Sequence, residues 1–160
     1  SLESESLKTI EEIQLPDAVE NILQSLEPQL REKQISVVKD YHPFMVKMNA
    51  EDFDKLVRNL IDNAIKYNKQ GGSIYLTIKD RKLSVKDTGI GISLENQSRV
   101  YERFFRVDKA RSKKSGDTGL GLAIVKHICN YYDLQISLES ELNVGSDFTV
   151  RFPENKKYNS

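Results

Sequence analysis

One short segment constrains this chain more than any other. Within residues 59–67, the side chains of Asn59, Asn63, Lys66 and Tyr67 follow at i, i+4, i+7 and i+8. This spacing places them on one face of an α-helix. Asparagine is a mediocre helix former, so two asparagines four residues apart within a helix need a reason other than helix propensity. The sequence therefore predicts a helix whose polar stripe has a functional role.

The residue types in this stripe suit a metal-bound nucleotide. Mg²⁺ prefers hard oxygen ligands and takes few of them from protein, so the amide oxygen of Asn63 suffices beside phosphates and water, with Asn59 as a second candidate. Lys66 offers a cation to phosphate, and Tyr67 offers a ring to the base. The alternatives are surface asparagines, a boundary tyrosine, and an i,i+4 ion pair between Lys66 and Asp62.

Residues 87–91 form a second motif. Asp87 ends a predicted strand, and Gly89 and Gly91 follow it and allow a ligand to approach closely. A carboxylate at this place can accept the exocyclic amino hydrogen of adenine, where guanine presents an acceptor instead. The same Asp-Thr-Gly triplet also fits a simple turn or an aspartic protease, but its second copy at 117–119 follows no strand.

A third motif lies at the start of a later helix, where Gly119 and Gly121 leave backbone N–H groups free for phosphate. A Gly-x-Gly pair alone is a weak signal, and the chain has neither a P-loop nor a complete dinucleotide fingerprint. Residues 106–118 before it are polar and basic without apolar periodicity, which predicts a loop or lid. Taken together, the three motifs indicate ATP binding.

Composition narrows the remaining function classes. The 160 residues are 38% hydrophobic and 30% charged, which suits one globular domain with its own core. Because 24 basic residues balance 24 acidic ones, we expect no nucleic-acid partner. The single cysteine, Cys129, excludes an intrachain disulfide and a cysteine-based zinc site. No apolar run reaches the roughly 18 residues of a membrane span, so we expect a cytoplasmic chain without membrane contact.

Hydrophobic periodicity predicts the order of the elements. A helix should begin with Asp17 as its N-cap and be kinked or stopped by Pro28, and a second should be capped by Asn49. Helical structure is also expected within 93–105 and over 119–133, and strands over 35–41, 44–48, 73–79, 82–86, 134–139 and 147–152. The fold class is α+β, a two-layer α/β sandwich with a mixed sheet of about five strands, three helices on one face and a flexible ATP lid.

Together the motifs resemble the catalytic, ATP-binding domain of bacterial sensor histidine kinases, a superfamily shared with gyrase, MutL and a heat-shock chaperone. The resemblance covers residues 16–153, with 1–15 as a residual linker from a preceding dimerisation helix and 154–160 as a tail. The matching segments are the N box at 59–67, the first glycine box at 87–91, the F box at 102–105, the second glycine box at 116–122 and the ending at 145–150.

The resemblance implies a role for each box. Asn63 would bind Mg²⁺ with Asn59 nearby, and Asp87 would bond the adenine amino group. Phe104 and Phe105 would anchor the lid. The implied catalytic residues are Asn59, Asn63, Lys66 and Arg106. The implied nucleotide contacts are Asn63, Lys66, Tyr67, Asp87, Gly89, Gly91, Ile92, Arg106, Arg111, Thr118, Gly119, Leu120, Gly121 and Leu122.

The function implied is a kinase module that binds Mg-ATP and donates the γ-phosphate to a histidine on a separate dimerisation domain, with a response regulator downstream. Neither His42 nor His127 precedes an acidic residue, so the acceptor is expected outside this chain, in a membrane-anchored sensor, and the fragment is expected to be a monomer. One alternative is an ATPase-driven clamp, disfavoured because Asn59 stands where such relatives carry a water-activating glutamate. The other is a nucleotide-binding regulatory module, which Asp117 in the second glycine box leaves open.

Overall fold

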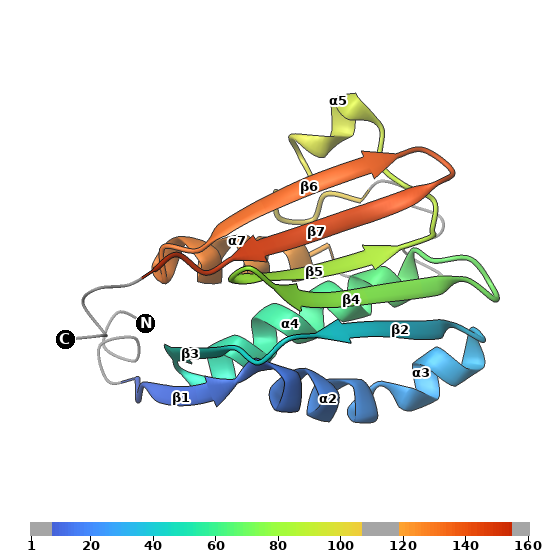
Figure 1. Cartoon of the computed structure of the whole chain (residues 1–160). Helices are drawn as coiled ribbons and strands as arrows, with labels where there is room; N and C mark the ends of the chain where they lie inside the picture. The colour runs from blue at the N-terminus through green and yellow to red at the C-terminus, as the bar shows by residue number, and fades with distance from the viewer. Residues whose placement is uncertain (1–7, 107–118, 155–160) are drawn as a thin grey trace.

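The computed structural model describes residues 8–106 and 119–154. Figure 1 shows two layers, a twisted sheet and a set of helices packed behind one of its faces. This is the α+β sandwich predicted from the sequence. The elements in chain order are β1 (Glu11–Gln14), α2 (Leu15–Ser25), α3 (Glu27–Glu32), β2 (Ser36–Tyr41), β3 (Met45–Met48), α4 (Ala50–Lys66), β4 (Ser73–Lys79), β5 (Lys82–Asp87), α5 (Leu94–Gln97), α7 (Gly121–Tyr131), β6 (Gln135–Glu141) and β7 (Gly145–Arg151).

The main sheet has five strands in the order β2-β4-β5-β7-β6. β2 runs parallel to β4, and the other neighbours are antiparallel, so the sheet is mixed as predicted. β1 and β3 form a separate antiparallel ribbon in which Ile13 lies opposite Val46. The assignment of residues 1–15 to a linker from a preceding dimerisation helix stays a prediction, and the strand Glu11–Gln14 within this range was not predicted. β2 and β3 flank the His42-Pro43 turn but do not pair with each other.

The start of α4 agrees with the cap predicted from the sequence, and the start of α2 does not. Asn49 caps α4 as predicted, because its Oδ1 accepts the backbone N–H of Asp52 at 3.0 Å. The predicted cap at Asp17 was wrong, since the N-cap of α2 is Gln14 and Asp17 lies in the first turn. Pro16 occupies the first turn, where proline lacks only an unneeded N–H, so the helix begins directly after β1. The interruption expected at Pro28 occurs just before it, because α2 ends at Ser25 and Pro28 lies in the first turn of α3.

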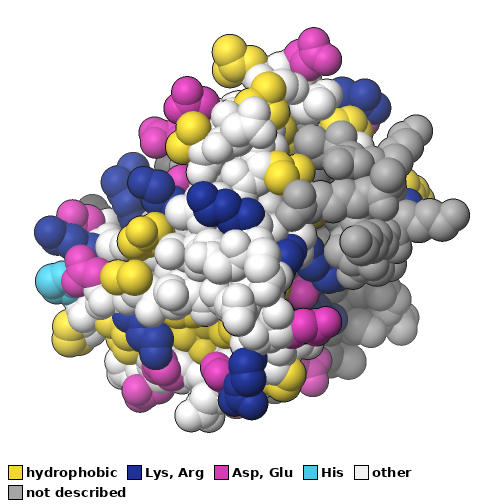
Figure 2. Space-filling model, turned by 90° about the vertical axis from the view of Figure 1, so that its right-hand side faces the viewer, with side chains coloured by type: hydrophobic (Ala, Val, Ile, Leu, Met, Phe, Trp, Pro, Cys, Tyr) yellow, Lys and Arg dark blue, Asp and Glu magenta, His cyan; other side chains and the backbone are white. Residues whose placement is uncertain are grey.

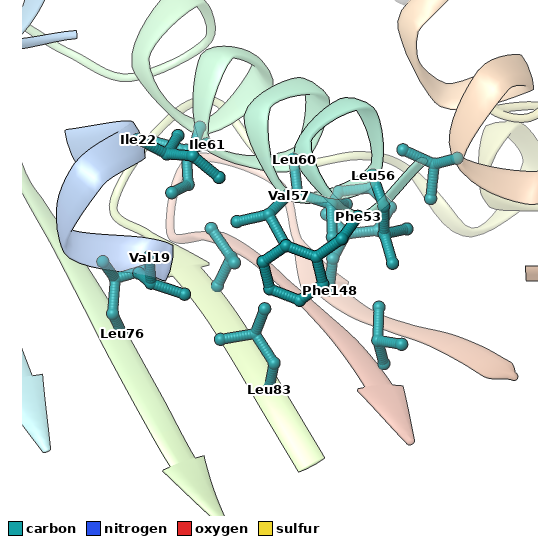
Figure 3. Close-up of a cluster of buried hydrophobic side chains, with 14 of the residues drawn as sticks. Val19, Ile22, Phe53, Leu56, Val57, Leu60, Ile61, Leu76, Leu83 and Phe148 are labelled. Atoms are coloured by element: carbon teal, nitrogen blue, oxygen red, sulfur yellow. The ribbon is translucent and has the colours of Figure 1, made fainter. Parts of the chain in front are cut away.

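The core lies between the sheet and the helices, and α4 is its centre. Leu60 and Ile61 are fully buried, and burying each such side chain contributes about 1.5–3 kcal/mol. Because this face of α4 is fixed against the sheet, the polar stripe of the same helix is turned toward the open edge of the domain. Figure 3 shows the cluster, which includes Val19, Ile22, Phe53, Leu56, Val57, Leu60, Ile61, Leu76, Leu83 and Phe148.

A buried carboxylate joins α4 to the end of α7. The Tyr132 hydroxyl donates to Oδ2 of Asp52 at 2.5 Å, and the Lys8 ammonium lies 2.9 Å from the same oxygen. Burial favours a higher pKa for Asp52, but the bonds from Tyr132 and Lys8 outweigh it and hold that pKa below its ordinary value. Asp52 is therefore kept charged by its partners.

Removing the Tyr132 hydroxyl should measurably weaken this junction. In Tyr132→Phe, the buried carboxylate of Asp52 loses a donor, so we expect the free energy of unfolding to fall by about 1–3 kcal/mol. Urea denaturation at pH 7 measures the change. Tyr75→Phe removes a hydroxyl from a 40% exposed tyrosine on β4 and should change stability by less than about 0.5 kcal/mol. Equal losses in both variants would contradict a specific role for Tyr132.

Charges of both signs are interspersed over the face shown in Figure 2, and neither sign dominates it. This distribution agrees with the balance of 24 basic and 24 acidic residues in the whole chain. Among the residues described, none of the helices combines the length and the apolar character that crossing a bilayer demands.

Candidate functional site

An open cleft lies between the polar stripe of α4, the loop after β5 and the start of α7. Its empty space, counted together with the open mouth, is about 710 Å³. The cleft brings together the three sequence motifs. The predicted site residues that line it are Asn59, Asn63, Lys66, Tyr67, Asp87, Gly91, Ile92, Gly119, Gly121 and Leu122.

Other predicted residues lie elsewhere. Gly89 and Arg106 are not among the cleft-lining residues of the described chain, and Leu120 lines a different groove beside Ile124 of α7. Arg111, Thr118 and Asp117 lie outside the described residues, as does most of the predicted lid. The predicted site residues that line the cleft therefore come from the N box, the stretch 87–92 and the stretch 119–122.

The polar stripe of α4 is held by bonds along the helix. The Lys66 ammonium lies 3.0 Å from Oδ2 of Asp62, which confirms the predicted i,i+4 pair, and both residues line the cleft. The Asn59 amide nitrogen donates to the carbonyl of Lys55 at 2.7 Å. Its Oδ1 faces α7, because a Cβ placed on Gly121 would lie 2.9 Å from that oxygen. A glycine at 121 thus leaves room for the amide oxygen of Asn59.

Asp87 is the buried charged group of the cleft. It is 4% exposed, and its Oδ1 accepts the backbone N–H groups of Gly89 at 2.9 Å and Ser146 at 3.2 Å. Burial raises the pKa of Asp87 to about 6, the two N–H bonds oppose this rise, and the nearby Asp147 adds to it. Since both backbone donors among the described residues go to Oδ1, Oδ2 is the oxygen left for a ligand.

The glycines beside Asp87 serve close packing of the backbone. A Cβ on Gly89 would lie 2.0 Å from the carbonyl oxygen of Tyr67, and one on Gly91 would lie 2.0 Å from that of Glu141. Gly91 also has φ +69°, a conformation that disfavours other residues. The space at these positions is filled by the chain's own carbonyls, whereas the predicted close approach of a ligand to Gly89 and Gly91 stays a prediction.

The two phenylalanines of the F box behave differently from each other. Phe105 lines the cleft and packs against the core, and the Arg99 guanidinium lies 4.5 Å above its ring. The Phe104 side chain is 68% exposed, and its anchoring of the lid, most of which lies outside the described residues, stays a prediction. Its backbone has φ +66° and donates an N–H to the carbonyl of Gly119 at 2.8 Å.

Sequence reasoning missed several residues that line the cleft. Ile90 lies inside the first glycine box and could have been included on that ground. Val100 lies within the helical stretch predicted for 93–105 and Ser146 within the family-like ending at 145–150, but neither residue was given a role in the site. Ser146 is 59 residues from Asp87, yet its backbone N–H bonds the Asp87 carboxylate. The wall of the cleft therefore depends on strand pairing that no local motif encodes.

Comparisons with known proteins agree with this architecture. Residues 48–156 match the family described as histidine kinase-, DNA gyrase B-, and HSP90-like ATPase. Sensor histidine kinase YkoH of Bacillus subtilis is 37% identical over 150 residues, which cover 92% of this chain and 32% of that protein. Sensor-like histidine kinase SenX3 of Mycolicibacterium smegmatis is 47% identical over 102 residues, which cover 61% of this chain and 27% of that protein.

A solved structure gives the same result for the fold. The structure titled mycobacterial sensor histidine kinase MprB has a TM-score of 0.78 and 26% identity to this chain, over 89% of this chain and 97% of that one. The chain spans about a third or less of the length of the two curated relatives. On the family match and this fold, the chain belongs to the histidine kinase-, DNA gyrase B- and HSP90-like ATPases.

Proposed function

We propose that this chain is the ATP-binding portion of a protein-histidine kinase. It binds Mg-ATP in the cleft and presents the γ-phosphate to a histidine on a separate dimerisation and phosphoacceptor domain. A response regulator acts downstream, and the chain is the cytoplasmic part of a membrane-anchored sensor. The observation that carries this proposal is the Asp87 carboxylate, which two backbone N–H groups fix in the same cleft that the polar stripe of α4 lines.

The two ends of the cleft suit the two ends of a nucleotide. At one end, Oδ2 of Asp87 accepts the adenine amino group while Ile92, Val100 and Leu122 offer apolar surface to the ring. At the other end, Lys66 offers positive charge to the phosphates. We include Arg106 as a second phosphate contact, because the resemblance to histidine kinases implies it. The cleft therefore orients ATP with its base buried and its phosphates toward α4.

The amide oxygens of the stripe fit Mg²⁺. Asn63 lines the cleft, and the Oδ1 of Asn59 faces the glycines at the start of α7. Neutral, hard oxygen donors suit an ion that takes its other ligands from phosphates and water. The bound ion would supply charge neutralisation of the phosphates. Asn63, with Asn59 beside it, would hold it.

Asn59 also separates kinase from ATPase chemistry. An amide cannot accept a proton from water, so Asn59 cannot act as a general base. The cleft is therefore suited to retaining ATP until another nucleophile approaches the γ-phosphate. This favours transfer to a histidine over the ATPase-driven clamp.

A titration of ATP by calorimetry tests this function. We expect the wild-type chain to bind ATP more tightly with Mg²⁺ than without it. In Asn63→Ala, this gain should be lost, a change of about tenfold or more in the dissociation constant. Asn21→Ala, an exposed asparagine of α2 outside the cleft, should retain the full Mg²⁺ effect.

The outcomes separate the proposal from its alternatives. Absence of ATP binding by the wild-type chain would contradict the proposed function. Binding without transfer of phosphate to a histidine of an added phosphoacceptor domain would favour the nucleotide-binding regulatory module. Release of inorganic phosphate in the absence of that domain would favour the ATPase clamp.

A further inference from the structure

A lysine behind the cleft holds the end of the helix that carries the polar stripe. Lys33 follows α3, and its ammonium donates to the carbonyl of Ile65 at 2.9 Å and to that of Lys66 at 2.8 Å. The last carbonyls of a helix have no partner within the helix and lie at the negative end of its dipole. A partly buried ammonium with two such bonds therefore fixes the last turn of α4.

The backbone of Lys33 strengthens the same attachment. Its carbonyl accepts the N–H of Gly71 at 2.9 Å, so Lys33 also holds the loop that follows α4. Lys33 bonds the chain before and after Tyr67, and the Tyr67 carbonyl in turn accepts the N–H of Ile90 at 3.0 Å. The end of α4 is thus joined to Lys33 on one side and to the first glycine box on the other.

We propose that Lys33 is a positioning residue for the phosphate end of the cleft. Its ammonium fixes the carbonyls of Ile65 and Lys66 and thereby the direction in which the Lys66 side chain leaves α4. Lys33 is not among the described residues that line the cleft, so it acts through Lys66 and does not touch the nucleotide. This inference rests on the proposed function, because it assumes that Lys66 meets phosphate.

The test compares two ligands that differ only in their phosphates. Lys33→Met keeps the length of the side chain and removes its charge and donors. We expect this variant to bind Mg-ATP about tenfold more weakly. Its affinity for adenosine, which lacks phosphate, should change by less than about twofold. Lys33→Arg keeps a cation and donors and should recover most of the ATP affinity. Calorimetry with each ligand measures both constants.

Two further variants make the test specific. Lys39→Met removes a lysine that pairs with Glu20 at 2.8 Å on the surface of β2, and it should leave both affinities unchanged. In a Lys66→Met background, replacing Lys33 should cause no additional loss of ATP affinity, because the two residues act through one contact. If Lys33→Met does not fold, Lys33→Gln, which keeps a neutral donor, is compared in the same way.

The results distinguish this inference from the proposed function. Failure of the wild-type chain to bind ATP would overturn both. Suppose that the wild-type chain binds ATP, and that the Lys33 variants either weaken the binding of ATP and of adenosine equally or leave both unchanged. The inference is then overturned and the proposed function stands. An undiminished effect of Lys33→Met in the Lys66→Met background would also overturn it.

Discussion

The Asp87→Asn variant is expected to lose nucleotide binding and to gain stability. The amide oxygen of the new asparagine should keep the backbone N–H groups of Gly89 and Ser146, which bond Oδ1 at 2.9 and 3.2 Å. The amide nitrogen then replaces Oδ2 and presents a donor to the amino group of adenine. Because a charged acceptor is replaced by a donor that opposes another donor, ATP affinity should fall about 100-fold or more.

The gain in stability follows from the raised pKa of the Asp87 carboxyl. Burial raises that pKa from 3.8 to about 6, so the folded protein binds the proton more tightly than the unfolded chain does. The native state is thus favoured below pH 4, and this advantage is lost as the pH rises through 6. At pH 7, a neutral amide avoids the cost of the buried charge, which is about 1–3 kcal/mol.

Urea denaturation and calorimetry check both halves of this prediction. Asp87→Asn should exceed the wild-type chain in free energy of unfolding at pH 7, and the difference should shrink at pH 4. Asp40→Asn, which replaces an exposed carboxylate on β2, should bind ATP normally and change stability by less than about 0.5 kcal/mol. A destabilised Asp87→Asn protein that still binds ATP would show that Asp87 serves the fold and not the nucleotide.

The elements that sequence predicted well are those with a local cause. The limits of α4 follow from the side-chain cap at Asn49 and from its apolar period. The β4–β5 hairpin turns at Asp80 and Arg81, which both have positive φ, as a two-residue hairpin turn requires. β1 was missed, because its four residues are stabilised by pairing with β3, in which Glu11 lies opposite Met48. Such pairing leaves no local pattern.

The same distinction holds in the cleft. Asn63 and Lys66 were found because helical spacing alone places them on one face. The packing role of Gly89 was not predicted, because it depends on where the carbonyl of Tyr67 lies in the folded chain. The contact of Ser146 with Asp87 likewise requires β7 to lie beside β5. Sequence therefore predicted which residues gather at the cleft better than how the backbone holds them there.

Gly89→Ala is expected to disable the cleft without altering any side chain that lines it. The added Cβ would lie 2.0 Å from the Tyr67 carbonyl oxygen, so backbone must shift. That carbonyl accepts the N–H of Ile90, and the N–H of Gly89 itself orients the Asp87 carboxylate, so both bonds should be disturbed. We expect a loss of about 3–5 kcal/mol in free energy of unfolding and loss of ATP binding.

Gly71→Ala is the matched control, because alanine there strains the backbone without colliding with another atom, whereas alanine at Gly89 collides with the Tyr67 carbonyl. Gly71 has φ +75°, so alanine is strained there, but nothing lies within 4 Å of its added Cβ. The control should therefore cost only about 1 kcal/mol and bind ATP as the wild-type chain does. Urea denaturation and ATP calorimetry compare the two variants. Equal losses would mean that the Tyr67 carbonyl can move aside cheaply, and that the close packing at Gly89 does not hold the nucleotide-facing side of the cleft in place.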